Sequence, residues 1–196
     1  MTQALPKLVN FEEFVEWLPE NSALRYELHN RDIVEMAQPV GEHEAVISFL
    51  AVEIPVEIKR LGLPYGIPRQ VIVRPPEKDS GYFPDVLVLN RANLANETLW
   101  QKQSILSLGA SIPLVIEVVS TNWRDDYYLK YADYEEMGIP EYWIVDPQEQ
   151  IVAVLRLESG EYVEVGMFQG EQTLVSPTFP QLNLTAGQVL GGEFQL

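Results

Sequence analysis

The sequence predicts a mixed α/β (α+β) fold in one domain. The order of the expected elements is helix, strand, strand, helix, strand, and from Ile151 onward the pattern changes to hairpins. A chain of 196 residues is long enough for one domain with a substantial core. We therefore expect one domain with an extended β-rich part toward the C-terminus.

The first elements are a short helix and a hairpin. Asn10 can cap a helix over residues 11–18, whose apolar side chains lie on one face. Residues 24–28 and 33–36 are typical of two strands joined by the polar turn at residues 29–32.

A longer helix is expected next, from about Glu42 to Arg60, because apolar residues recur there at helical spacing. Pro55 should kink or interrupt this helix, since proline lacks the backbone N–H that a helix interior needs. Residues 71–73 then form a short strand that ends at Pro75.

Two acid-bearing strands follow, one beginning at Asp85 and the other within residues 112–120. A polar loop with a helical turn connects them over residues 94–107. Residues 124–137 have a helical pattern, and Gly138 is a natural stop.

The last part of the chain is expected to be β-rich. Residues 141–145 predict one more strand, residues 151–157 and 162–168 predict a hairpin, and residues 173–175 and 182–184 predict short closing strands.

Composition excludes several classes of function. The chain has no cysteine, only two histidines and no glycine-rich phosphate loop, which argues against thiolate chemistry, histidine-based zinc sites and nucleotide P-loops. No signal peptide or membrane-spanning run is present, so we expect a cytoplasmic protein without a membrane partner.

The charge is strongly acidic. With 29 acids against 13 bases the formal charge is −16, which is unfavourable for non-specific nucleic-acid binding. A local basic strip remains open, as does the alternative of scattered solvated bases; the residues concerned are Lys59, Arg60, Arg69, Arg74 and Lys78.

Glu117 is the most informative residue, because it lies inside an apolar run typical of a strand covered on both faces. A carboxylate there is strongly disfavoured unless a cation, a metal ion or several donors meet it. Asp85 is a second acid of this kind, at the start of the preceding apolar strand. Lys130 follows on a helix rich in tyrosine. Two strand-borne acids and one helix-borne lysine suggest a metal site.

Each of these residues also has a purely structural interpretation. Glu117 could pair with Lys130 or an arginine for stability alone, and Asp85 could cap a neighbouring turn. Lys130 could be a solvated helix residue that pairs with Asp126 or Tyr134.

The hairpin and the first long helix carry further candidates. Glu27 and Glu35 are equally reasonable as the inward-facing acid of the hairpin. His43 is expected to be a helix-start residue rather than a ligand. The helix tyrosines are expected to pack on the sheet, and Trp143 is expected in the core.

Together these residues resemble the Uma-two family of restriction-endonuclease-like proteins. The resemblance lies in the acid after Pro84, the segment at residues 117–120, Lys130 with Tyr131 and Tyr134, the segment at residues 138–147, and Tyr26, Glu27, Leu28 and His43 near the N-terminus. It runs from about residue 24 to residue 147 and loosely to the C-terminus.

The resemblance implies a restriction-endonuclease-like core with a central mixed sheet flanked by helices, within one domain over residues 1–196. The core would occupy about residues 24–147 and a β-hairpin extension residues 148–196. The family belongs to the PD-(D/E)xK phosphodiesterase superfamily. The motif of that superfamily has a lysine two residues after the glutamate, but this chain has Val119 there. Lys130 from the following helix would take the role of that lysine.

The implied chemistry is Mg²⁺-dependent phosphodiester hydrolysis, with Mn²⁺ as a substitute. Asp85, Glu117 and the carbonyl of Val118 would hold the metal ion, because Mg²⁺ prefers a few hard oxygen ligands and retains several waters. Lys130 would assist the nucleophilic water or neutralise the phosphate, and Glu27 would bind a metal-bound water or a second ion.

Two hypotheses follow. The first is a DNA endonuclease that acts on double-stranded DNA, as a homodimer because one small domain covers few base pairs. The second is a non-catalytic interaction module with the same fold, in which the acids serve only structure. The acidity of the chain favours the second, and the intact set of Asp85, Glu117 and Lys130 favours the first.

Overall fold

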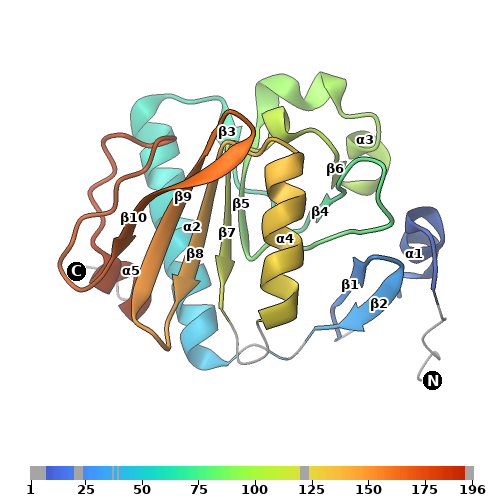
Figure 1. Cartoon of the computed structure of the whole chain (residues 1–196). Helices are drawn as coiled ribbons and strands as arrows, with labels where there is room; N and C mark the ends of the chain where they lie inside the picture. Colours follow the sequence, from blue (N-terminus) through green and yellow to red (C-terminus); the bar gives the residue numbers. More distant parts are fainter. Residues whose placement is uncertain (1–7, 20–23, 37, 39, 120–123, 193–196) are drawn as a thin grey trace.

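A six-stranded mixed sheet forms the centre of the protein (Figure 1). The computed structural model describes residues 8–19, 24–36, 38, 40–119 and 124–192. The strands lie in the order β10-β9-β8-β7-β5-β3, and the β7–β8 pair is parallel while the other pairs are antiparallel. Their bounds are β3 (Tyr65–Gly66), β5 (Val86–Asn90), β7 (Leu114–Val118), β8 (Glu141–Asp146), β9 (Ile151–Glu158) and β10 (Glu161–Phe168).

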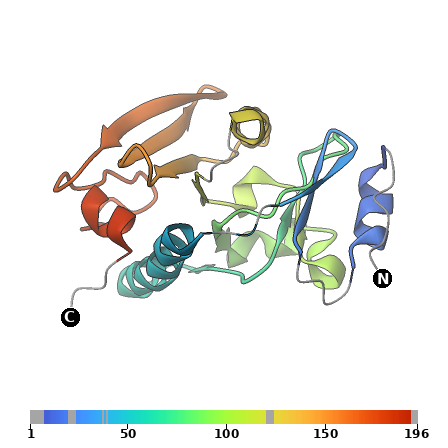
Figure 2. The ribbon, with the colours of Figure 1, turned by 90° about the horizontal axis from the view of Figure 1, so that it is seen from below.

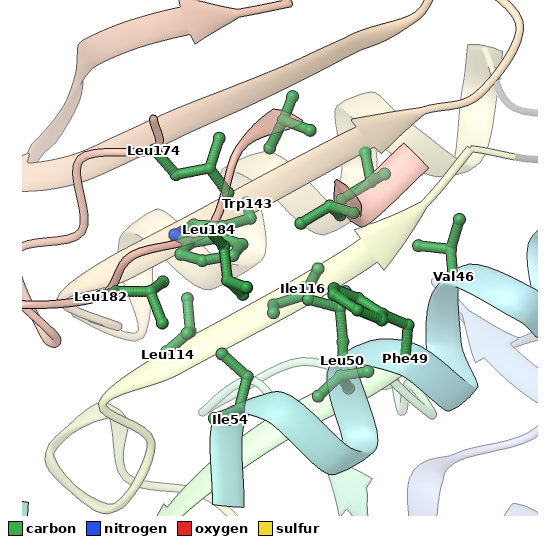
Figure 3. Close-up of a cluster of buried hydrophobic side chains, with 14 of the residues drawn as sticks. Val46, Phe49, Leu50, Ile54, Leu114, Ile116, Trp143, Leu174, Leu182 and Leu184 are labelled. Carbon is green, nitrogen blue, oxygen red and sulfur yellow. The ribbon is translucent and has the colours of Figure 1, made fainter. Parts of the chain in front are cut away.

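Helices cover both faces of this sheet. The long helix α2 (Gly41–Leu61) lies on one face and α4 (Arg124–Glu136) on the other (Figure 2). On the α2 face, Val46, Leu50 and Ile54 pack against alternate side chains of β7 and against Trp143 of β8 (Figure 3). Because side chains alternate along a strand, Val115 and Glu117 of β7 point to the opposite face, where α4 lies.

A smaller unit adjoins the start of β5. It consists of α1 (Phe11–Trp17) and the hairpin of β1 (Tyr26–His29) and β2 (Asp32–Glu35). The hairpin turn places Asn30 and Arg31 at φ angles of 47° and 77°, the pair of positive φ values that a tight two-residue turn requires. Two backbone hydrogen bonds between Leu28 and Gly81 then fix β1 beside the segment that leads into β5.

Short elements complete the fold. They are β4 (Ile72–Val73) paired in parallel with β6 (Ile105–Leu106), the 3-10 helices η1 (Arg91–Asn96) and η2 (Gly109–Ser111), and the helices α3 (Trp100–Gln103) and α5 (Ala186–Gly191). The edge strand β10 contains a bulge between Glu164 and Gly166. No described helix combines the length and the apolar character that a bilayer crossing requires.

Most expected elements are confirmed, including both hairpins, the long helix and the two strands that carry the acids. Pro55 does not interrupt the long helix, because α2 continues through it. The neighbouring residues Ala51, Val52 and Val56 are exposed, so the missing backbone hydrogen bond falls on the solvent side of the helix, where it is least costly.

The two closing strands are also not formed as expected. Residues 173–175 and 182–184 run side by side with one backbone hydrogen bond from Leu174 to Leu184 and one bridge between Thr173 and Thr185, without regular strands. The helix α5 that follows, capped by Thr185, was not anticipated from the sequence.

Candidate active site

The candidate site lies where β5 begins and β7 ends. Val86 pairs with Ile116 in an antiparallel register, so the residues before and after them, Asp85 and Glu117, stand on adjacent strands at the same level. The Val118 N–H donates to Asp85 Oδ2 at 2.9 Å. The two acids that the sequence singles out therefore lie together.

Glu27 of β1 completes a group of three acids. Its Oε1 accepts hydrogen bonds from the Phe83 N–H at 2.8 Å and from Lys130 Nζ at 3.0 Å, and His29 Nε2 lies 2.9 Å from its Oε2. Glu27 is fully buried, whereas Glu35 on β2 is exposed. The alternative between these two glutamates is thus resolved: Glu27 faces the site.

Lys130 reaches the acids from α4. Its Nζ donates to Glu27 Oε1 at 3.0 Å and to Glu117 Oε2 at 3.2 Å. One turn later on the same helix, the Tyr134 hydroxyl donates to Glu117 Oε1 at 2.7 Å. Lys130 is therefore not a solvated helix residue. Tyr134, which was a possible partner of Lys130, pairs with Glu117.

Asp85 has partners on its other side. His43, near the start of α2, places Nε2 at 3.3 Å from Asp85 Oδ2, and the guanidinium of Arg25 lies 3.9 Å from Oδ1. The Nδ1 atom of His43 is buried and has no hydrogen-bond partner in the described structure. His43 begins a helix, as expected, but it also belongs to the site.

The four central side chains are almost closed to solvent. Their exposed fractions are 0% for Glu27, 8% for Asp85, 12% for Glu117 and 7% for Lys130. Electrostatic interactions between them are therefore only weakly screened.

Burial and neighbouring charges shift the pKa values in this group. Burial raises the pKa of Glu117 to about 7, an effect that Lys130 opposes and that Asp85 and Glu27 increase. Burial alone would lower the pKa of Lys130, but the three carboxylates outweigh it and raise that pKa well above the ordinary value. For Glu27, Lys130 and His29 outweigh burial and lower the pKa. The site thus holds more negative charge than Lys130 alone balances.

This donor set suits a magnesium ion. Within the described ranges no three His, Cys, Asp or Glu side chains form a metal cage, but Mg²⁺ needs only one or two carboxylates and keeps its waters. The Val119 N–H bonds to Val145 O in β8. Because backbone groups alternate in direction along a strand, the Val118 carbonyl faces the Asp85 side. Asp85, Glu117 and that carbonyl could hold the ion, whose charge would offset the surplus of acids.

The site includes residues that the sequence reasoning did not assign to it. Tyr134 is four residues after Lys130, and His29 is two residues after Glu27, so helix and strand periodicity place each on the same side as its neighbour. That spacing could have pointed to both. Behind them, the Tyr82 hydroxyl donates to Asp133 Oδ2 at 2.6 Å, and Lys130 Nζ lies 5.7 Å from the centre of the Tyr82 ring.

Comparisons with known proteins agree with this architecture. The crystal structure described as "a putative nuclease belonging to DUF820 from Anabaena variabilis ATCC 29413" superposes with a TM-score of 0.75 and 21% sequence identity, covering 94% of this chain and 98% of that chain. The two proteins share this mixed α/β fold. A search of the curated proteins found no match. Residues 11–187 match the Uma2 family model, described as "Putative restriction endonuclease". The chain therefore belongs to the Uma2 (Uma-two) family.

Proposed function

We propose that this protein is a Mg²⁺-dependent phosphodiesterase that cleaves DNA as an endonuclease. One observation carries the proposal: Lys130 lies between Glu27 and Glu117 in a buried group that also contains Asp85. The description of the family as restriction endonucleases supports the same class of reaction.

The metal ion would be held by Asp85, Glu117 and the Val118 carbonyl, and Mn²⁺ would substitute for Mg²⁺. Such an ion lowers the pKa of a bound water and offsets the charge that develops on the phosphate during hydrolysis. The chain orients these ligands through hydrogen bonds: the Val118 N–H and His43 fix Asp85, and Tyr134 fixes Glu117.

Lys130 would act as a protonated donor. The carboxylates around it raise its pKa, so the ammonium form is kept at neutral pH. An ammonium group can orient the attacking water and neutralise a phosphate oxygen, whereas removing a proton from water would require the neutral amine. Glu27 would hold Nζ in place for that task. Arg25, about half exposed beside Asp85, would contact the incoming phosphate.

We further propose double-stranded DNA as the substrate and a homodimer as the acting form. One domain of this size spans few base pairs, and a twofold pair of sites would face both strands. Size-exclusion chromatography with light scattering, with and without a duplex, tests the dimer. A protein that stays monomeric in both conditions would contradict it.

Nicking of supercoiled plasmid DNA in Mg²⁺ or Mn²⁺ tests the catalytic proposal. We expect Asp85→Ala, Glu117→Gln and Lys130→Ala each to lower the rate by about 100-fold or more, since each removes a metal ligand or a charge-stabilising donor. Glu35→Gln is the matched control, because it changes an exposed acid of the same hairpin and should leave the rate unchanged.

Nicking that survives all three site variants would eliminate the proposal. Calorimetric titration with Mn²⁺ separates the remaining cases: binding that disappears in Asp85→Ala supports a metal site. Absence of both nicking and Mn²⁺ binding in the wild type would favour the non-catalytic interaction module.

A further inference from the structure

Most described lysine and arginine side chains pair with a carboxylate. Three members of the basic strip considered from the sequence are neutralised in this way: Arg60 by Glu57, Arg74 by Glu12, and Lys78 by Asp133 and Glu136. That strip is therefore not available as a continuous basic surface. In the part of the chain that the structure describes, the cations without an ion pair are Lys59, Arg69, Arg91 and Lys102.

Three of these four cations line one hollow. Lys59, Arg69 and Arg91 border a cavity of about 640 Å³ between α2 and the residues that carry β3. It lies at the end of β5 where Asn90 pairs with Tyr65, whereas Asp85 precedes the opposite end of that strand. The hollow is thus a second site, separate from the acidic one, and its volume is that of a small-molecule pocket.

The position of Arg91 depends on a glycine. A Cβ added at Gly66 would lie 2.7 Å from an Arg91 guanidinium nitrogen, so any larger residue there would displace this flexible side chain. The Arg91 N–H also bonds to the Pro64 carbonyl at 2.9 Å, which ties the arginine to the same loop. The guanidinium therefore lies against Gly66 at the edge of the hollow, where Arg91 remains exposed to solvent.

Apart from the three cations, most side chains of the lining are aliphatic or aromatic. Ile58, Leu63, Tyr65 and Ile67 are among the apolar side chains of the wall. Pro55 and Ala51 also line it, and because proline has no N–H the Ala51 carbonyl lacks its usual helical donor. The hollow thus offers cations, an apolar bed and an unused hydrogen-bond acceptor.

We propose that this hollow binds a nucleotide. Lys59, Arg69 and Arg91 would contact the phosphate, the apolar wall with Tyr65 would pack on the base, and the Ala51 carbonyl would accept from an amino group of the base. In a chain with a formal charge of −16, cations left unpaired around an apolar cavity match a ligand that is itself anionic and planar. The nucleotide could be free or part of a single strand, and the proposal does not depend on catalysis at the acidic site.

Isothermal titration calorimetry in EDTA tests the proposal without the metal site. The probes are AMP, inorganic phosphate and a single-stranded oligo-dA of about eight nucleotides, within the site size of common single-strand-binding folds. We expect saturable AMP binding that weakens by roughly tenfold or more in Arg69→Ala/Arg91→Ala, as expected when charge-assisted hydrogen bonds are lost. Lys102→Ala, which removes the unpaired cation outside the hollow, should leave the affinity unchanged.

Two further variants probe the wall. Gly66→Ala should weaken AMP binding by displacing Arg91, and Pro55→Ala should weaken it by giving the Ala51 carbonyl a helical donor. Tighter binding of the oligonucleotide than of AMP assigns the site to a strand, and equal binding assigns it to free nucleotides.

Three outcomes would overturn the proposal: no saturable binding of AMP or oligonucleotide up to millimolar concentration, unchanged affinity in the double arginine variant, or phosphate binding as tight as AMP binding.

Discussion

Two buried glutamates on neighbouring strands of the sheet have different surroundings. Glu117 of β7 contacts Lys130 and Tyr134 and lies near two other acids. Glu141 of β8 is fully buried, and its oxygens accept from neutral groups, including the Trp143 indole N–H at 2.5 Å and the Thr178 N–H at 2.6 Å.

The difference teaches that burial of an acid does not by itself identify a reactive site. Burial raises the pKa of both glutamates, and hydrogen bonds from Thr178 and Trp143 limit the rise for Glu141. Glu141 ties the sheet to the segment that contains Thr178. Around Glu117, three acids outnumber the two cations beside them, Lys130 and Arg25, and the remaining negative charge suits an additional cation.

The largest effect is expected for Lys130→Met. This change leaves Glu27, Asp85 and Glu117 buried without their ammonium partner, so the free energy of unfolding should fall by about 3–5 kcal/mol. Urea unfolding measures the loss, and millimolar Mg²⁺ should recover part of it by replacing the missing charge. Lys102→Met, on an exposed side chain, is the control. A loss below ~1 kcal/mol in Lys130→Met would contradict the charge balance described above.

The next largest effect is expected for Glu141→Ala. It leaves the Trp143 indole N–H and the Thr178 N–H without their acceptor, which should cost about 2–3 kcal/mol of stability. Mn²⁺ binding, measured by calorimetry on the folded variant, should stay at the wild-type level. Lost Mn²⁺ affinity would show that the two glutamates are not as independent as their contacts indicate.

The pH dependence of stability in EDTA should distinguish the wild type from the Glu117→Gln variant. The pKa of Glu117 rises from an ordinary 4.5 to about 7 on folding, so the folded state binds more protons between these values. The free energy of unfolding of the wild type should therefore fall as pH rises through this window and level off above it. Glu117→Gln removes this contribution. The free energy of unfolding of the variant, relative to that of the wild type, should therefore be higher above the window than below it, by up to about 3 kcal/mol. Urea unfolding of both proteins below and above this pH window checks the expectation. If the variant and the wild type differ in stability by the same amount at both pH values, the expectation is refuted.

The smallest effect is expected for His43→Ala. His43 contacts Asp85 but is not among the proposed ligands, so its loss should weaken Mn²⁺ binding by roughly tenfold through a less well oriented carboxylate. His43→Asn, which can still donate a hydrogen bond, should recover part of the affinity. Equal affinities in all three proteins would exclude a positioning role for this histidine.

The positions of the central side chains could be predicted because burial of charge is costly. Asp85 and Glu117 stand out in apolar strands, and Lys130 is the amine that follows on the next helix. His43 and Glu27 could not be assigned to the site from the sequence on the same grounds, because a histidine at a helix start and an acid in a hairpin are both common. Tertiary contacts such as the pairing of Leu28 with Gly81 and the hydrogen bond from the Phe83 N–H bring Glu27 beside Lys130.

The elements that the sequence did not predict have physical reasons too. β3 and β6 contain two residues each, too few to show alternation. The glycine-rich helix α5 has little helical propensity of its own, and its packing on α2 stabilises it. The apolar residues at 173–175 and 182–184 fill the core from extended segments, so they resemble strands without pairing as such.

The two edges of the central sheet constrain how copies of the protein can associate. One edge is the two-residue strand β3, and the other is β10, whose bulge at Glu164 and Gly166 interrupts regular pairing. Short and bulged edges discourage the addition of a foreign strand. Joining of two sheets into one continuous layer is therefore disfavoured, which favours self-association through side chains of the helices and loops.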